Sequence, residues 1–344
     1  MDPIAPFSLH RDDIDGTHDR WAAVDSVRRM VQSGHGEWSP NRQRPDIIDV
    51  LTLDGRLPFA VLDGGLSTAL EAMGVTPTGR LWTAQAVIDQ PEAVVAAHRS
   101  AVDAGADVVI SASYQASADG FEAAGLDRHA ARAALSSTTD LARRSGARLV
   151  AASVGPYGAC RADGSEYHGR YDVDWSEVRR FHRQRLEVLV DTDADIFAVE
   201  TIPTIAEASV ILEELRRLTD LPAWLSFACA DSGHLVGGEP IAAAALAVAG
   251  DVRLVGVNCT APQHVGPLLE AIVDAARLPC VAYPNAGASW DADARCWQGV
   301  AQPCDLATAA GAWAAAGAVL IGGCCGVGSD VVAALAGARD AGYR

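Results

Sequence analysis

Short apolar runs alternate with longer amphipathic stretches from residue 58 to the end of the chain. The runs are continuous rather than alternating in polarity, which is typical of strands buried on both faces of a parallel sheet. The predicted strands are Phe59–Asp63, Asp107–Ser113, Leu149–Ser153, Ile196–Glu200, Ala223–Phe227, Leu254–Asn258, Cys280–Tyr283 and Ala318–Gly322.

The stretches between these runs are rich in Ala and Leu and have helical spacing. Pro91 suits the first turn of one predicted helix, and Asp174 with Glu177 forms a capping-box pattern before another. The clearest predicted helices are Pro91–Ala104, Trp175–Val190, Ile205–Leu218 and Ala307–Ala316. Eight strand–helix units in this order predict an α/β fold of the (β/α)8 TIM-barrel type.

Residues 1–45 precede this pattern and are predicted to be an N-terminal extension, with the barrel domain over residues 46–344. Apolar residues recur at helical spacing within Asp19–Gln32, which predicts a helix that lies on the barrel. The residues that follow, Ser33–Pro45, contain Gly, Pro and Asn and predict a loop.

Charge and composition narrow the possible functions. A net charge of −17 without any basic stretch argues against a nucleic acid or an anionic membrane as a partner. All 27 basic residues are arginines, which excludes lysine Schiff-base chemistry and a P-loop lysine. No apolar run reaches membrane-spanning length, and the polar N-terminus does not resemble a secretory signal. We therefore expect a soluble cytoplasmic protein with reduced cysteines.

Polar residues gather directly after the predicted strands, and in a TIM barrel these positions surround one mouth. Cys259 follows the sixth run, and Cys324 and Cys325 follow the eighth, between glycines. Each cysteine alone would suit a buried core position, but together they predict a site of three thiolates with one open position. Soft ligands in that number favour zinc. The nine histidines show no metal-binding spacing, and His182 is expected to be solvated in the arginine-rich face Arg179–Arg185.

Several ordered segments resemble the zinc-dependent homocysteine S-methyltransferase family over nearly everything from Asp46 to the end. They begin at Leu62 (LDGGLST), Ser113 (SYQAS), Ser153 (SVGPYGA), Asp163 (DGSEY), Val199 (VETIP), Gly256 (GVNC), Tyr283 (YPN) and Gly322 (GGCCG). The Asp163 segment resembles the branch that uses S-methylmethionine or S-adenosylmethionine, rather than betaine. The sequence departs from the family pattern after Cys325, where Gly326-Val-Gly-Ser-Asp stands in place of a segment ending in Thr-Thr-Pro.

The resemblance implies roles for residues at the strand ends. Asp63 and Glu200 would bind the amino group of homocysteine, although either could also cap a helix or hold a loop. Gly64 and Gly65 would leave backbone N–H groups free for the substrate carboxylate. Tyr114 would lie near the zinc or the donor methyl, or else be an ordinary rim aromatic.

The sequence leaves two roles open for Asn258 and Asn285: orienting loops or hydrogen-bonding substrate. The implied ligand set is one Zn²⁺ per chain on Cys259, Cys324 and Cys325.

The expected reaction is the transfer of a methyl group to L-homocysteine to give methionine. A homocysteine sulfur in the fourth zinc position would attack the methyl group of a sulfonium donor, and no general base is required. Two alternatives remain at this point: a methyltransferase that acts on a selenol or another small thiol, and a non-catalytic zinc-thiolate or redox protein. Asp63 and Glu200 favour an amino-acid acceptor, which the second alternative would not need.

Overall fold

The computed structural model describes residues 46–52, 55–76, 79, 81–161, 163–287, 289–291, 296–298 and 305–342. The expected N-terminal extension, with its helix Asp19–Gln32, lies outside these residues. Among the described helices, none is both long and apolar enough to cross a membrane.

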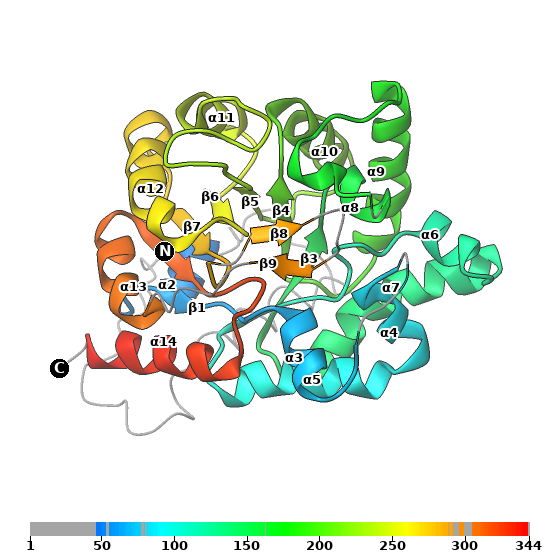
Figure 1. The fold of residues 1–344 in the computed structure, drawn as a ribbon, viewed down its shortest axis with the longest axis horizontal. Coiled ribbons are helices and arrows are strands. Elements are labelled where there is room, and N and C mark those ends of the chain that lie inside the picture. Colours follow the sequence, from blue (N-terminus) through cyan, green and yellow to red (C-terminus); the bar gives the residue numbers. More distant parts are fainter. Residues whose placement is uncertain are drawn as a thin grey trace, which may run out of the picture.

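Eight parallel strands form the centre of the molecule, in the order β1-β10-β7-β6-β5-β4-β3-β2 (Figure 1). Their bounds are β1 Ala60–Val61, β2 Val108–Ile110, β3 Leu149–Val154, β4 Ile196–Ile202, β5 Ala223–Phe227, β6 Leu254–Asn258, β7 Cys280–Tyr283 and β10 Ala318–Ile321. A parallel bridge between Leu62 and Val108 joins the first and last strands of this order. The TIM barrel predicted from the sequence is therefore confirmed.

Helices follow the strands around the outside of the barrel (Figure 1). After β1 to β4 come α3 Leu66–Ala72, α4 Thr83–Asp89, α5 Pro91–Asp103, α6 Ala118–Ala123, α7 Arg128–Arg144, α8 Tyr157–Arg161, the 3₁₀ helix η3 Ser165–Tyr167, α9 Trp175–Leu189 and α10 Ile205–Leu218. After β5, β6, β7 and β10 come α11 Ile241–Val248, α12 Pro262–Ala276, α13 Leu306–Ala315 and α14 Ser329–Ala341. An antiparallel pair, β8 Ser289–Asp291 and β9 Cys296–Gln298, is inserted between β7 and α13.

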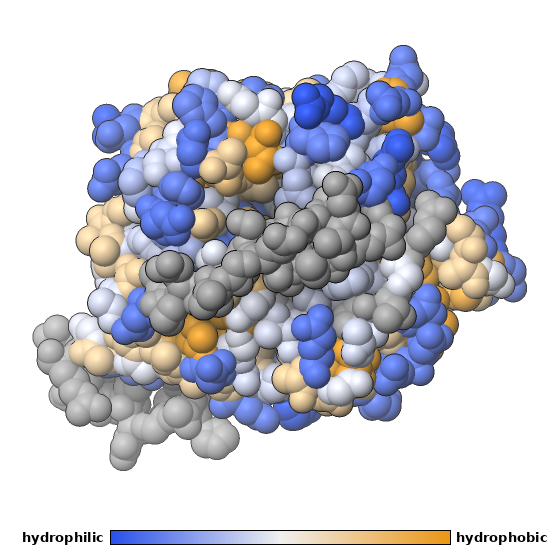
Figure 2. Space-filling view, in the orientation of Figure 1, coloured by the Kyte–Doolittle hydropathy of each residue, from blue (hydrophilic) through white to orange (hydrophobic). Residues whose placement is uncertain are grey.

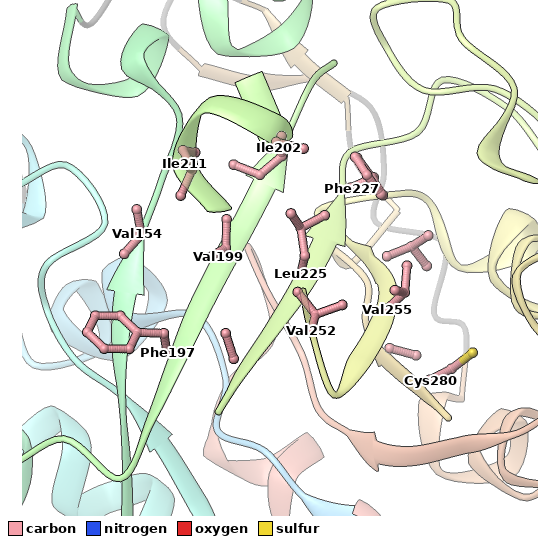
Figure 3. Close-up of a cluster of buried hydrophobic side chains, with 14 of the residues drawn as sticks. Val154, Phe197, Val199, Ile202, Ile211, Leu225, Phe227, Val252, Val255 and Cys280 are labelled. Carbon is pink, nitrogen blue, oxygen red and sulfur yellow. The ribbon is translucent and has the colours of Figure 1, made fainter. Parts of the chain in front are cut away.

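The buried side chains of the strands alternate between two cores. Phe197 and Val199 of β4 point outward, where they pack with Ile211 of α10 and with neighbouring strands (Figure 3). Ile196 and Ala198 of the same strand belong to a separate cluster inside the barrel. This alternation follows from the two-residue period of a strand, and each fully buried large apolar side chain contributes about 1.5–3 kcal/mol.

A short helix before the first strand joins the interior cluster. This helix, α2 Ile47–Thr52, contributes Ile47, Val50 and Leu51, which pack with residues at the starts of several strands such as Leu149 and Leu254. These positions lie at the amino ends of the strands, so α2 packs at the end of the barrel opposite the mouth. The sequence analysis did not predict this helix.

Two helix-start predictions can be compared with the structure. Pro91 lies in the first turn of α5, as predicted. Asp174 caps α9 by accepting a hydrogen bond from the backbone N–H of Ser176 at 2.7 Å. In a capping box, Glu177 would in turn accept a hydrogen bond from the N–H of Asp174. Here the Glu177 carboxylate instead accepts a hydrogen bond from the Tyr157 hydroxyl at 2.9 Å.

The expectation of a solvated His182 is wrong. His182 and Arg185 are 0% and 1% exposed. Both lie on the face of α9 that also carries Val178 and Leu189, because residues three and four apart share one face of a helix. Arg179 and Arg183, on the other side, form ion pairs with Glu214 at 2.7 Å.

The surface of the face seen in Figure 2 is mostly hydrophilic. Hydrophobic residues among those described appear there only in small, separate groups. Among the described residues, the most exposed large apolar side chain is Leu246, which belongs to the short α11.

Candidate metal centre and substrate pocket

Three cysteines from two strand ends meet at the mouth of the barrel. Cys259 directly follows β6, and Cys324 and Cys325 follow β10. The Sγ atom of Cys325 lies 3.7 Å from that of Cys259 and 3.9 Å from that of Cys324. Among the described residues, this is the one group of three His, Cys, Asp or Glu side chains with the spacing of a metal site.

The sulfur spacing can be tested against the geometry of zinc. Two sulfurs that each lie about 2.3 Å from a tetrahedral zinc are separated by about 3.8 Å. The separations of 3.7 and 3.9 Å therefore fit a common zinc ion, and all three sulfurs lie within 4.8 Å of one another. All three cysteines are free thiols. Hydrogen bonds from Cys259 and Cys324 lower the pKa of the Cys325 thiol, so it is the first of the three to become a thiolate.

The segment after β7 holds both cysteine loops in place. Cys259 donates its N–H to the carbonyl of Tyr283 at 3.2 Å, and Cys324 donates its N–H to the carbonyl of Pro284 at 2.8 Å. The Asn285 amide donates to the Cys259 carbonyl at 3.3 Å. Cys259 has a φ of 48°, an uncommon conformation for a residue other than glycine. The contact of Asn285 with the Cys259 carbonyl favours the loop-orienting alternative that the sequence left open.

The two glycines after β1 allow the cysteine loop to approach closely. A Cβ atom would lie 2.5 Å from the Val327 carbonyl oxygen at Gly64, and 2.7 Å from the Cys324 carbonyl oxygen at Gly65. The expectation that both N–H groups are free is wrong for Gly65, because its N–H donates to the Val327 carbonyl at 3.0 Å. The N–H of Gly64 has no hydrogen-bond partner among the described residues. The glycines at 64 and 65 could have been interpreted from the sequence as a sign that another backbone segment, here the one around Val327, packs closely against them.

The cysteines open into a cavity of about 400 Å³. Its acidic residues are Asp63, Glu166 and Glu200, and no arginine or histidine is among its described lining residues. The aromatic lining residues are Trp82, Tyr114, Tyr167 and Tyr283. A cavity with this lining attracts a cationic ligand and repels an anionic one.

Asp63 and Glu200 both lie in this cavity and both are almost fully buried, each 6% exposed. Asp63 accepts a hydrogen bond from the N–H of Ile110 at 2.9 Å, and Glu200 accepts one from the Ser153 hydroxyl. Burial raises the pKa of Asp63 well above its usual range and raises the pKa of Glu200 to about 8. Such carboxylates favour a positively charged partner, because the partner offsets the cost of their desolvation.

Asn258 does not line the cavity. It is 0% exposed, and its side-chain oxygen accepts hydrogen bonds from the N–H of Thr201 at 2.7 Å and from the Ser226 hydroxyl at 2.9 Å. Its amide also donates to the Thr201 hydroxyl at 2.7 Å. Thr201 is a cavity residue with a φ of 60°. The contacts therefore favour the loop-orienting role of Asn258 over direct contact with substrate.

Tyr114 lines the cavity, and the buried Arg185 bonds to its backbone. Burial raises the pKa of the Tyr114 hydroxyl well above its usual range, so this group stays neutral. Arg185 of α9 donates hydrogen bonds to the carbonyls of Tyr114 at 2.6 Å, Gly155 at 2.9 Å and Ser113. One guanidinium therefore joins the ends of β2 and β3.

Two further cavity residues, Glu166 and Tyr167 of η3, were not singled out from the sequence. Burial raises the pKa of Glu166 to about 7, and its Oε2 atom has no hydrogen-bond partner among the described residues. Burial raises the pKa of Tyr167 too, and negative charge on Cys259, Cys325 and Cys324 raises it further. Tyr167 lines the same cavity as these cysteines. Both residues belong to the DGSEY segment, which was used only as a family motif.

The profile of the homocysteine S-methyltransferase family matches residues 60–339. This chain belongs to that family. The homocysteine S-methyltransferase of Escherichia coli is 39% identical over 289 residues, which cover 80% of this chain and 93% of that protein. Homocysteine S-methyltransferase 4 of Zea mays is 41% identical over 310 residues, which cover 83% of this chain and 90% of that protein.

A solved structure of the family shows the same architecture. The metallated form of the homocysteine methyltransferase MmuM from Escherichia coli superimposes with a TM-score of 0.74 at 36% sequence identity. The match covers 83% of this chain and 98% of that one. A family member therefore binds a metal, and the present chain has a cluster of three cysteines whose sulfurs suit one.

Proposed function

We propose that this chain is a homocysteine S-methyltransferase that uses a sulfonium methyl donor, S-methylmethionine or S-adenosylmethionine, and one zinc ion held by Cys259, Cys324 and Cys325. The observation that carries the proposal is the position of three thiols with zinc-like spacing in an acidic cavity at the barrel mouth. When bound there, zinc would supply an open position in which a thiol loses its proton at neutral pH.

The amino group of homocysteine suits the two buried carboxylates. Asp63 and Glu200 lie in the same cavity as the cysteines. Burial raises their pKa values, and an ammonium group beside them would stabilise their ionised forms. The N–H of Gly64, which also lines the cavity, is a candidate donor to the substrate carboxylate. This arrangement would direct the substrate sulfur toward the cysteine cluster.

The donor is proposed to be a sulfonium because of the charge of the cavity and the nature of the leaving group. Three acidic side chains and no described basic side chain line the cavity, so a bound cation would be stabilised there by their ionised forms. Aromatic rings such as Trp82 and Tyr114 can contact a cation through their faces. In the reaction the homocysteine sulfur forms a bond to the methyl carbon, the bond from that carbon to the donor sulfur breaks, and a neutral thioether leaves.

A methyl-transfer assay with parallel metal analysis tests the proposal. Zinc-loaded protein should convert homocysteine to methionine in the presence of a sulfonium donor, with one zinc per chain. Zinc binding without methyl transfer to any thiol or selenol would instead fit the non-catalytic zinc-thiolate protein. A cytoplasmic location, in which thiols remain reduced, suits the proposed chemistry.

A further inference from the structure

The chain between β3 and α9 forms one wall of the substrate cavity. We call its described residues, 157–161 and 163–171, the β3–α9 segment. Gly164, Glu166 and Tyr167 of this segment line the cavity. Cys259, Cys324 and Cys325 line the same cavity. The position of the segment therefore decides which groups face the cysteine cluster.

A single buried carboxylate outside the cavity contacts both ends of this segment. Glu207 lies in the first turn of α10 and is 0% exposed. Its Oε1 atom accepts a hydrogen bond from the N–H of Tyr157 at 2.6 Å, and its Oε2 atom accepts one from the hydroxyl of Tyr171 at 2.6 Å. Tyr157 begins the segment and Tyr171 ends it, so one side chain ties the two ends together.

Close packing carries the position of the two ends to the cavity residues. A Cβ atom at Gly158 would overlap the backbone nitrogen of Glu166, so the start of the segment lies directly against η3. The N–H of Gly169 donates to the carbonyl of Ser165 at 2.8 Å. Gly169 has a φ of 64°, and a Cβ there would lie 2.5 Å from the Thr204 side chain at the start of α10. Little free space therefore separates the tied ends from Glu166.

Glu207 places a carboxylate in a fully buried position, where an uncharged side chain would be more common. A buried carboxylate is costly unless its hydrogen bonds are well satisfied. Besides the two tyrosines, Glu207 contacts Nε2 of His182 at 3.0 Å, and burial lowers the pKa of that histidine, so it stays neutral. The two shortest hydrogen bonds of the Glu207 carboxylate, at 2.6 Å, are therefore both made with the β3–α9 segment.

We propose that Glu207 is a positioning residue that ties both ends of the β3–α9 segment and thereby places Glu166 and Tyr167 in the wall of the cavity that the three cysteines also line. This inference rests on the proposed function in one respect, since the benefit of the placement is tighter homocysteine binding. The geometric part, in which Glu207 holds the segment, stands independently of any activity.

The test compares the removal of two hydroxyl groups from the same aromatic pair. Tyr171→Phe removes the hydrogen bond from the hydroxyl to Glu207. Tyr157→Phe removes a hydrogen bond from the hydroxyl to Glu177, and this second bond is exposed to solvent. The two rings pack against each other at 5.2 Å, and both substitutions keep them. For Tyr171→Phe we expect the KM for homocysteine to rise about tenfold, the factor expected from the loss of one hydrogen bond to a charged group. We expect kcat and zinc content to change little, and Tyr157→Phe to resemble the unaltered protein.

Hydrogen–deuterium exchange of residues 157–171 provides a second measurement that does not depend on turnover. Tyr171→Phe should raise amide exchange in this segment and Tyr157→Phe should not. Glu207→Gln should raise exchange as well, because an uncharged amide with one acceptor oxygen weakens the hydrogen bonds to the segment. The substitution keeps the side-chain volume, so packing changes little. Faster exchange in a protein that transfers no methyl group would support the positioning role and reject the proposed function. Equal KM and equal exchange in the two tyrosine variants would overturn the positioning role.

Discussion

The sulfur atoms of Cys259 and Cys325 lie 3.7 Å apart although 66 residues separate them in the sequence. Only the barrel topology brings them together, since β7 lies between β6 and β10 and its following residues bind both cysteine loops. The spacing required for a shared metal is therefore built into the strand ends and does not depend on a flexible loop.

Replacement of any one of Cys259, Cys324 or Cys325 by alanine should abolish zinc binding and methyl transfer while the fold is retained. The stability of a TIM barrel resides in its core and in the face opposite the mouth. Zinc content by mass spectrometry of the native protein, circular dichroism and the methyl-transfer assay check this prediction. Cys280→Ala is the control, because Cys280 is a buried free thiol in the outer core of β7 and should keep its zinc. A metal-free alanine variant with full activity would contradict the assignment.

Asp63→Asn and Glu200→Gln should weaken homocysteine binding and leave zinc bound. Each substitution removes one charged partner of the substrate ammonium, at a cost of roughly 2–5 kcal/mol for a buried pair. Titration calorimetry of homocysteine into the zinc-loaded variants measures the effect. Glu187→Gln, an exposed position on α9, is the matched control. The same affinity in all three variants would remove Asp63 and Glu200 from the substrate site.

Much of the fold could be predicted from the sequence because strand burial leaves a local signal. Runs such as Ile196–Glu200 are apolar without interruption, and the polar residues that end them mark the mouth of a barrel. The cysteine cluster followed from the same logic, since Cys259 comes directly after one predicted strand and Cys324 comes two residues after the end of another.

The partners of individual side chains could not be predicted in this way. His182 belongs to a helix with many arginines, yet its contact with Glu207 comes from α10, a different element. Likewise, whether the N–H of Gly65 is free depends on Val327, far along the chain. Spacing within one element contains no information on such contacts, because they form only when the barrel closes.

The stability of the protein should fall between pH 7 and pH 5 because of His98 in α5. This side chain is 2% exposed, and burial lowers its pKa to about 4. The unfolded chain, with an ordinary histidine pKa of about 6.5, binds the proton first as the pH falls. The stabilisation is therefore complete above about pH 6.5 and is lost as the pH falls toward 4, by about 2 kcal/mol at pH 5.

Urea unfolding of the metal-free protein at pH 7.5 and pH 5 tests this dependence. His98→Gln should reduce the difference in the free energy of unfolding between the two pH values by about 2 kcal/mol, whatever its effect at pH 7.5. His129→Gln is the control, because His129 is exposed at the start of α7. An unchanged pH dependence in His98→Gln would show that other groups are responsible.

S-Methylmethionine should be the preferred donor, followed by S-adenosylmethionine, with betaine essentially inert. The acidic cavity favours any cation, so charge alone does not separate these three compounds. The difference lies in the leaving group, because a sulfonium releases a neutral thioether more readily than a quaternary ammonium releases an amine. The order of the two sulfoniums depends on the shape of the cavity, whose wall includes Gly323, Cys324 and Cys325 just before the segment that departs from the family pattern. Initial rates of methionine formation at saturating homocysteine, with zinc content measured in the same samples, establish the order. Faster turnover of betaine than of either sulfonium would overturn the proposed donor class.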